Sequence, residues 1–212
     1  YYLGFIANQN SEYELAKNYL LYALECGFIS IDLYEQLSLS YIKTQDYESI
    51  IPILNQAIYF DPSNQNFIYY LGLSYFHIGA YNEAIKFLKR YYIQNNQDIT
   101  AAYLIGVCYF KNEEYKLSFK YLDIANTNSD YEILYYLGFC SYKLGNYTQS
   151  VRFYKKSLIL SPNNPNAIYS LGQSYIDLNN KKEAKRQLKV LMGIDINLFE
   201  LLKLSFDTKF NS

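Results

Sequence analysis

Apolar side chains recur at helical spacing along the whole chain. Within residues 65–78, Ile68, Leu71, Tyr75 and Ile78 follow one another at steps of three or four, which places them on one face of a helix. The same spacing elsewhere predicts an all-α protein made of paired helices and one final helix. The helices are expected at residues 1–9, 12–26, 31–43, 47–60, 65–78, 82–95, 99–111, 115–127, 131–143, 147–160, 165–178, 181–192 and 195–208.

The pattern repeats with a period of 34 residues. An aliphatic residue followed by a small one marks each repeat, and the intervals between the small residues are 34, 34, 34, 32 and 34 residues. The small residues are Gly4, Ser38, Gly72, Gly106, Gly138 and Gly172. Nine residues further on come Tyr13, Tyr47, Tyr81, Tyr115, Tyr147 and Lys181. A constant period of this length predicts helix pairs that bury their apolar faces by stacking on neighbours.

The third repeat carries the fullest motif, with Leu71-Gly72, Tyr75, Ala84 and Leu88, and Asp61-Pro62 closes the repeat before it. This motif resembles the tetratricopeptide repeat family over nearly the whole chain. The resemblance implies a right-handed superhelical solenoid of stacked antiparallel helix pairs with a C-terminal capping helix. The array is expected to span residues 1–194, with repeats at about 1–30, 31–64, 65–98, 99–130, 131–164 and 165–194, and residues 195–212 are the capping helix and tail.

Several local features are expected from single residues. Gly72 lies in the middle of a helix, where glycine is unfavourable, so we expect it to let the backbone approach Ala84 across the turn. Pro52 falls inside the helix expected at 47–60 and should kink it. The expected N-caps of the second helices are Ser11-Glu12, Asn82-Glu83 and Asn146.

Composition narrows the class of protein. The net charge is −1, so a general electrostatic grip on nucleic acid is not expected. No run of apolar residues is long enough to insert into a membrane and no signal peptide is visible, so a cytoplasmic location is favoured. Because residue 1 is Tyr and the first helix is short, we expect the natural protein to continue upstream. The basic stretch at residues 181–189 is interpreted as the solvated face of one helix.

Nothing in the sequence predicts an enzyme or a cofactor. Cys26, Cys108 and Cys140 form no metal-binding spacing and are interpreted as small buried side chains. The one histidine, His77, has no nucleophile near it in the sequence. No phosphate-binding loop, dinucleotide fingerprint, zinc-protease or serine-hydrolase motif occurs.

The resemblance also indicates where a ligand would bind. In this family the first helices line the concave face, and ligand contacts come from four positions around each small residue. The candidate groove residues are Tyr69, Leu73, Phe76, His77, Tyr103, Val107, Phe110, Lys111, Tyr135, Phe139, Tyr142, Lys143, Tyr169 and Gln173. The Lys and Asn clamp by which some members grip a C-terminal carboxylate is absent, because the corresponding pairs are Tyr69 with Leu73 and Tyr103 with Val107.

Tyrosine fills one groove position in five of the six repeats: Tyr1, Tyr69, Tyr103, Tyr135 and Tyr169. A basic edge of Lys43, His77, Lys111 and Lys143 follows on the next turn. Such a groove suits an extended or helical peptide with apolar anchors and some acidic character. The tyrosines could equally reflect an AT-rich genome, which raises Tyr everywhere, together with packing between helices.

The leading hypothesis is therefore a scaffold that binds a peptide or protein segment in an aromatic concave groove. One alternative is a structural arm of a multi-protein assembly, which includes homo-oligomerisation through the same surface. Another is a regulatory segment of a larger enzyme or sensor.

Overall fold

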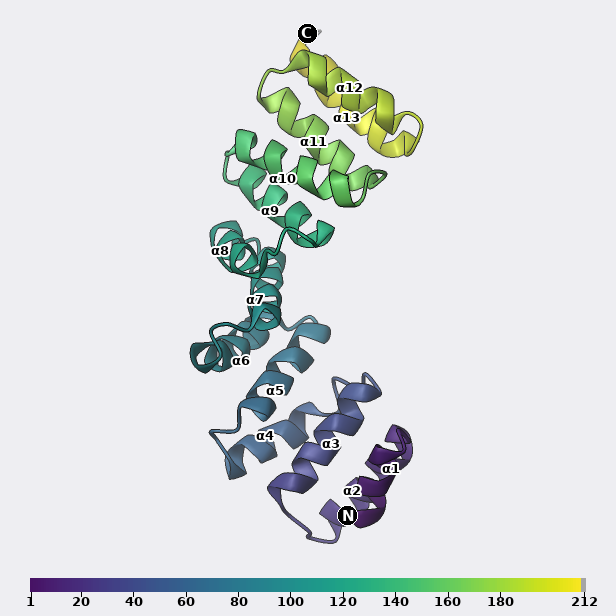
Figure 1. Cartoon of the computed structure of the whole chain (residues 1–212), viewed down its shortest axis with the longest axis vertical. Coiled ribbons are helices and arrows are strands. Elements are labelled where there is room, and N and C mark those ends of the chain that lie inside the picture. Colours follow the sequence, from purple (N-terminus) through teal and green to yellow (C-terminus); the bar gives the residue numbers. More distant parts are fainter. Residues whose placement is uncertain (211–212) are drawn as a thin grey trace. The chain divides into compact units, whose positions relative to one another are not determined.

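The computed structural model describes residues 1–210, which form thirteen α-helices and no strand (Figure 1). The helices are α1 (Tyr2–Gln9), α2 (Tyr13–Glu25), α3 (Ile31–Lys43), α4 (Ile51–Phe60), α5 (Gln65–His77), α6 (Tyr81–Gln94), α7 (Ile99–Lys111), α8 (Tyr115–Ala125), α9 (Tyr131–Lys143), α10 (Tyr147–Leu160), α11 (Pro165–Asp177), α12 (Lys181–Leu191) and α13 (Ile196–Phe210). No helix within these residues is both long enough and apolar enough to cross a membrane.

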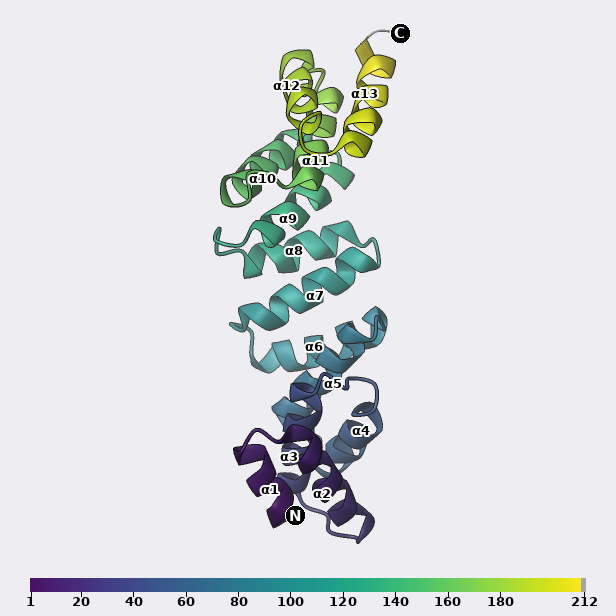
Figure 2. The same cartoon turned by 90° about the vertical axis from the view of Figure 1, so that its right-hand side faces the viewer.

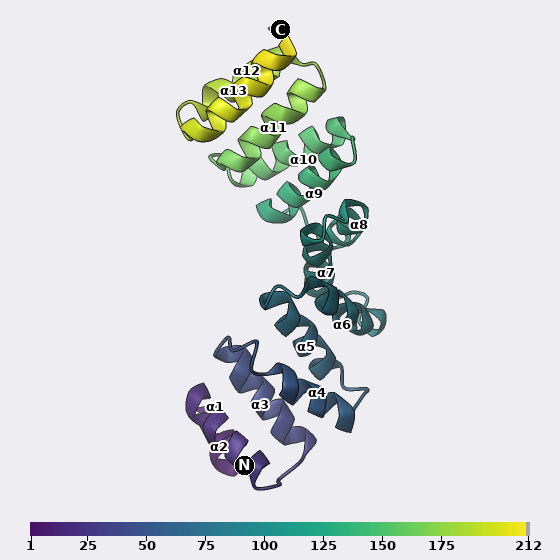
Figure 3. The same ribbon diagram turned by 180° about the vertical axis from the view of Figure 1, so that it is seen from behind.

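The chain is an all-α repeat solenoid that divides into two compact units, Tyr1–Cys108 and Tyr109–Ser212. In the first unit, α1 packs on α2 and α3, and α5 packs on α3, α4 and α6. In the second unit, α9 packs on α8, α10 and α11, and α11 also contacts α12. Helix α13 lies along α11 and α12 and covers the end of the second unit, as the capping prediction required (Figures 2 and 3). The right-handed superhelix stays a prediction.

Each unit has its own apolar core. In the first unit, Leu20, Leu37, Leu54 and Leu71 recur at the repeat spacing and are buried together. In the second unit the core includes Tyr154, Leu171, Leu188, Leu202 and Phe206, so α13 contributes to it directly. Helix α13 therefore buries apolar faces of α11 and α12 that would otherwise face water.

The small residues do bring paired helices close together, but the expected partner was wrong. The atoms nearest to a Cβ placed on Gly72 all belong to Leu88, with Cγ at 2.8 Å, and Ala84 is not among them. Gly4 faces Leu20 and Gly138 faces Tyr154, at the same separation of 16 residues. Facing positions on antiparallel helices depend on the length of the turn, which is why the contact falls one turn beyond Ala84.

Pro52 does not kink a helix, so that prediction was wrong. Helix α4 begins at Ile51, and Pro52 lies in its first turn, where a missing N–H leaves no hydrogen bond unmade. Residues 47–50 form turns instead. The helix expected at 47–60 is shortened because the proline has no N–H to donate to the carbonyl of Glu48.

The helix N-caps with side-chain hydrogen bonds lie on the first helices, not on most of the second helices. Ser30, Asn64, Asp98, Asp130 and Asn164 each accept a hydrogen bond from a backbone N–H in the next turn. Glu12 and Asn146 occupy N-cap positions but their side chains make no capping bond, and Asn82 lies within α6. Among the second helices, Asn180 caps α12 by accepting from the N–H of Glu183.

Candidate functional site

The candidate groove residues of the first unit begin on α5. Tyr69, Leu73 and Phe76 are half-buried, and His77 is exposed. The ring of Tyr69 lies 4.9 Å from that of Tyr91 on α6. Burial raises the pKa of Tyr69. Tyr69 is thus partly engaged in packing between helices and shows only part of its ring to solvent.

Two neighbours fix the aromatic groups beside α5. The Tyr91 hydroxyl donates to Asp98 at 2.9 Å, and burial together with this bond raises the pKa of Tyr91 to about 12. His77 stacks on Tyr47, with ring centroids 3.9 Å apart and planes 10° apart. Burial lowers the pKa of His77, so the ring is predominantly neutral at pH 7.

On α7, Tyr103 is half-buried, whereas Val107 is only 4% exposed. Val107 therefore offers almost no surface to a ligand, although it occupies a groove position in the repeat. Phe110 is half-buried and Lys111 is exposed at the end of the same helix.

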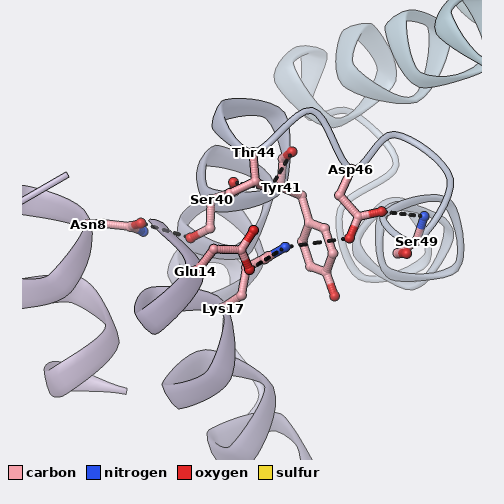
Figure 4. A network of polar contacts seen from close by, with 8 residues as sticks. All are labelled: Asn8, Glu14, Lys17, Ser40, Tyr41, Thr44, Asp46 and Ser49. Carbon is pink, nitrogen blue, oxygen red and sulfur yellow. Dashed lines mark hydrogen bonds and ion pairs between the residues drawn. The ribbon is translucent and has the colours of Figure 1, made fainter. Parts of the chain in front are cut away.

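In the first repeats of the array, polar contacts join neighbouring helices at the groove positions. The Asn8 amide donates to the backbone carbonyl of Gln36 at 3.0 Å and to its side chain at 2.9 Å. Ser40 donates to the Asn8 side-chain oxygen at 2.8 Å (Figure 4). Because these groups satisfy one another, this part of the surface is a structural joint between α1 and α3.

A buried cation lies nearby in the same unit. Figure 4 shows the Lys17 ammonium between two carboxylates, 2.9 Å from Glu14 and 3.5 Å from Asp46, with the ring of Tyr41 beside it. The ammonium is 5.1 Å from the centroid of that ring. Burial opposes the charged form, but the hydrogen bond and charge of Glu14, with Asp46, raise the pKa of Lys17. Lys17 is therefore an ion-paired link between α2 and the segment that follows α3.

The second unit contains a cavity of about 350 Å³. Its lining comes from α9, α10, α11 and α13. The lining residues are Phe139, Tyr142, Lys143, Tyr154, Tyr169, Ser170, Gln173 and Ser205. Five of these eight are candidate groove residues from the sequence: Phe139, Tyr142, Lys143, Tyr169 and Gln173. A larger but shallower hollow of about 450 Å³, lined by residues 145–149 with Arg152 and Leu178, contains none of the candidates.

Aromatic rings form most of the wall of this cavity. Tyr154 is fully buried, and Tyr135 packs behind the lining, 5.7 Å from the Tyr154 ring and 6.5 Å from Phe139. Phe110 extends the aromatic surface, with its ring 5.1 Å from Phe139. The first helices of the second unit thus present a continuous set of rings around one hollow.

The polar groups at the cavity are unevenly satisfied. The Tyr142 hydroxyl donates to Asp177 at 2.7 Å, and burial followed by this bond strongly raises the pKa of Tyr142. The Gln173 amide nitrogen makes a long contact of 3.5 Å to the same carboxylate oxygen. The Gln173 Oε1 atom is buried and has no hydrogen-bond partner. An unpaired buried acceptor of this kind is uncommon in folded proteins.

Lys143 supplies positive charge at the edge. Its side chain is exposed, and the ammonium lies 5.4 Å from the centroid of Phe139 and 5.8 Å from that of Tyr115. Within the described residues it forms no ion pair, and neither does Lys111. Both charges are thus available to an acidic ligand.

The sequence did not predict three of the lining residues. Tyr154 carried a signal, because tyrosine replaces the leucine found at this position in the other five repeats. Ser170 lies on α11 beside candidate residues but outside the four groove positions. Ser205 belongs to α13, which lies beyond the repeat register, so no periodic argument could have placed it.

Comparison with known proteins identifies the repeats. Residues 43–125 match the family described as anaphase-promoting complex, cyclosome, subunit 3. Residues 131–164 and 165–194 each match a tetratricopeptide repeat family. No curated protein sequence matches the chain.

Several solved structures share the fold. YrrB, described as a TPR protein with an unusual peptide-binding site, is 21% identical, with a TM-score of 0.76 over 87% of this chain and 97% of its own. MamA of MSR-1 is 21% identical, with a TM-score of 0.71 over 79% of this chain and 97% of its own. MamA from Desulfovibrio magneticus RS-1 is 18% identical, with a TM-score of 0.69 over 79% and 96%. Together with the family matches, the period and the helix pairs, these similarities lead to one conclusion: the chain belongs to the tetratricopeptide repeat family.

Proposed function

We propose that this protein is a scaffold that binds an acidic segment of a partner protein, with apolar anchors, on the first helices of its second unit. The family and its structural neighbours support a protein-interaction scaffold in general terms. One observation carries the finer proposal: the aromatic cavity is lined by five residues at the positions where this family contacts its ligands.

The chemistry of the surface decides which kind of segment fits. Aromatic rings offer large contact areas with little side-chain entropy to lose, and Phe110, Phe139, Tyr142 and Tyr169 supply them. Lys111 and Lys143 are exposed and unpaired within the described residues, so they favour carboxylates beside the apolar anchor. YrrB, whose description includes peptide binding, adds support from a protein of the same fold.

The proposal is tested by selecting peptides from a random display library on the full chain. We expect the wild-type protein to enrich peptides that combine acidic residues with an aromatic or large aliphatic residue. The double variant Lys111→Glu/Lys143→Glu should lose this enrichment by about tenfold or more, because two attractive charges become repulsive. Both side chains are exposed, so the fold should tolerate the changes.

The matched control reverses two exposed lysines on second helices, Lys116→Glu/Lys189→Glu, which leaves the net charge the same as in the test variant. It should enrich the same peptides as the wild type. If the wild type enriches nothing, or if the test variant retains the wild-type peptides, the proposed groove is wrong. Equal losses in both variants would indicate general electrostatic attraction and would also contradict it.

A further inference from the structure

We propose that the cavity of the second unit selects an aromatic side chain that carries a hydrogen-bond donor, tryptophan or tyrosine, and that Gln173 makes the selection. This inference rests on the proposed function, since it names the side chain that the bound segment inserts.

The size of the cavity indicates a single side chain. Its volume of about 350 Å³ is at the lower end for small-molecule sites. The rings of Phe139, Tyr142, Tyr154 and Tyr169 line it, and aromatic rings pack favourably against one another in tilted or offset arrangements. An inserted aromatic ring therefore matches both the space and the wall.

The unpaired oxygen of Gln173 distinguishes among aromatic side chains. The Tyr142 hydroxyl is already committed to Asp177, and the amide nitrogen of Gln173 is directed to the same carboxylate. Oε1 has no partner, and leaving a buried acceptor unpaired costs free energy. The terminal torsion of glutamine is soft, so the amide can turn toward a ligand. An indole N–H or a phenol O–H satisfies the oxygen, whereas phenylalanine leaves it unpaired.

The charge at the edge sets the residues next to the anchor. Lys143 lies over the Phe139 ring and forms no ion pair within the described residues. Asp177, the acidic group beside Gln173, accepts the Tyr142 hydroxyl. A carboxylate adjacent to the inserted residue therefore finds a free cation at Lys143, and an acidic peptide is the appropriate probe.

The test uses four acidic peptides, Asp-Glu-X-Glu-Asp, in which X is tryptophan, tyrosine, phenylalanine or leucine. Their affinities for the full chain are measured by competition against the labelled tryptophan peptide. The protein contains no tryptophan, so a blue shift of the peptide's emission reports burial of the indole directly. We expect the tryptophan and tyrosine peptides to bind about five- to tenfold more tightly than the phenylalanine peptide, the value of one net hydrogen bond.

Replacing the acceptor tests the role of Gln173. Gln173→Met keeps a long unbranched side chain without an oxygen, and the preference for tryptophan over phenylalanine should fall below about twofold. Gln173→Leu serves as a second such variant if the first is unstable. Gln149→Met, outside the cavity, is the matched control and should keep the full preference.

Three outcomes would overturn the inference. Equal binding of all four peptides would show that the cavity does not read a donor. An unchanged preference in Gln173→Met would show that another group reads it. If none of the four binds while the display selection still enriches peptides, the inference is wrong and the proposed function stands; if the selection fails as well, both are wrong.

Discussion

At the residue scale, Gly138 fixes the distance between α9 and α10. A Cβ at this position would lie 2.8 Å from two ring atoms of Tyr154. Tyr154 is fully buried and also lines the cavity, so its ring has no free space to move into. The glycine is thus required by a close approach of side chain to backbone, and that approach sets one wall of the binding site.

We expect Gly138→Ala to lower the free energy of unfolding by about 1–3 kcal/mol, the usual range for overpacking a core. The matched control is Gly193→Ala, where the nearest atom to the added Cβ is 3.8 Å away, and its effect should stay below about 1 kcal/mol. Denaturant unfolding followed by circular dichroism measures both. Equal stability of the two variants would mean that Tyr154 can move aside, against its complete burial.

At the scale of elements, α13 takes over the packing that the next repeat would supply. Leu202 Cδ2 would lie 2.5 Å from a Cβ on Gly172, and Leu202 and Phe206 are buried in the core of the second unit. In the preceding repeat the corresponding glycine faces Tyr154 of its own paired helix. The last helix pair therefore depends on an element outside the repeat register.

Leu202→Ala should lower the free energy of unfolding by about 2–5 kcal/mol, because it leaves a cavity in the core. The control on the same helix is Leu204→Ala, at a side chain that is 67% exposed, with an expected change within about 0.5 kcal/mol. Thermal unfolding of the full chain compares them. Similar losses would indicate that the helix contributes through its own helicity and not through Leu202.

Helical periodicity predicted every helix to within a few residues, except the start of α4. Periodicity cannot separate the turns at residues 47–50 from a first helical turn, because Tyr47 fits the repeat; the missing N–H of Pro52 decides the boundary. The turns between paired helices were also hidden. Each has one residue with positive φ, but only Gly79 and Gly145 reveal it, since Ser11, Gln45, Glu113 and Asn179 occupy the others.

The site was predictable only as far as the repeat register reached. Family positions named five of the eight cavity residues. Spacing within one repeat cannot show that Val107 is buried, because burial depends on tertiary packing. It cannot show that Asn8 is consumed by Gln36 and Ser40 either. The satisfaction of each polar group is a property of the folded chain.

At the scale of the whole molecule, repeat stability is largely a sum of local terms, so the two units should respond separately to acid. The first unit contains the ion pair of Lys17 with Asp46. Hydrogen bonds from Ser49, with the charge of Lys17, lower the pKa of Asp46 below its ordinary value of 3.8. A lowered pKa adds stability that is present above the unfolded value and is lost as pH falls through the folded one.

Acid should therefore loosen the first unit around α2 and α3 as the pH falls below about 4. Asp46→Asn should reduce protection of these helices at pH 7 and make that protection less dependent on pH over the acidic range. Hydrogen exchange resolved by peptide measures it, with Asp123→Asn in the second unit as the control. An unchanged acid response in Asp46→Asn would assign the sensitivity to other carboxylates.

Ser205 gives the terminal helix a second consequence. Because α13 both closes the array and lines the cavity, occupancy and docking of this helix are thermodynamically linked. A side chain held against Ser205 binds only while α13 is in place, and so it draws the equilibrium away from frayed states in which that helix has come off. The end of a repeat array is ordinarily where unravelling begins, and here the ligand itself would act as the clasp.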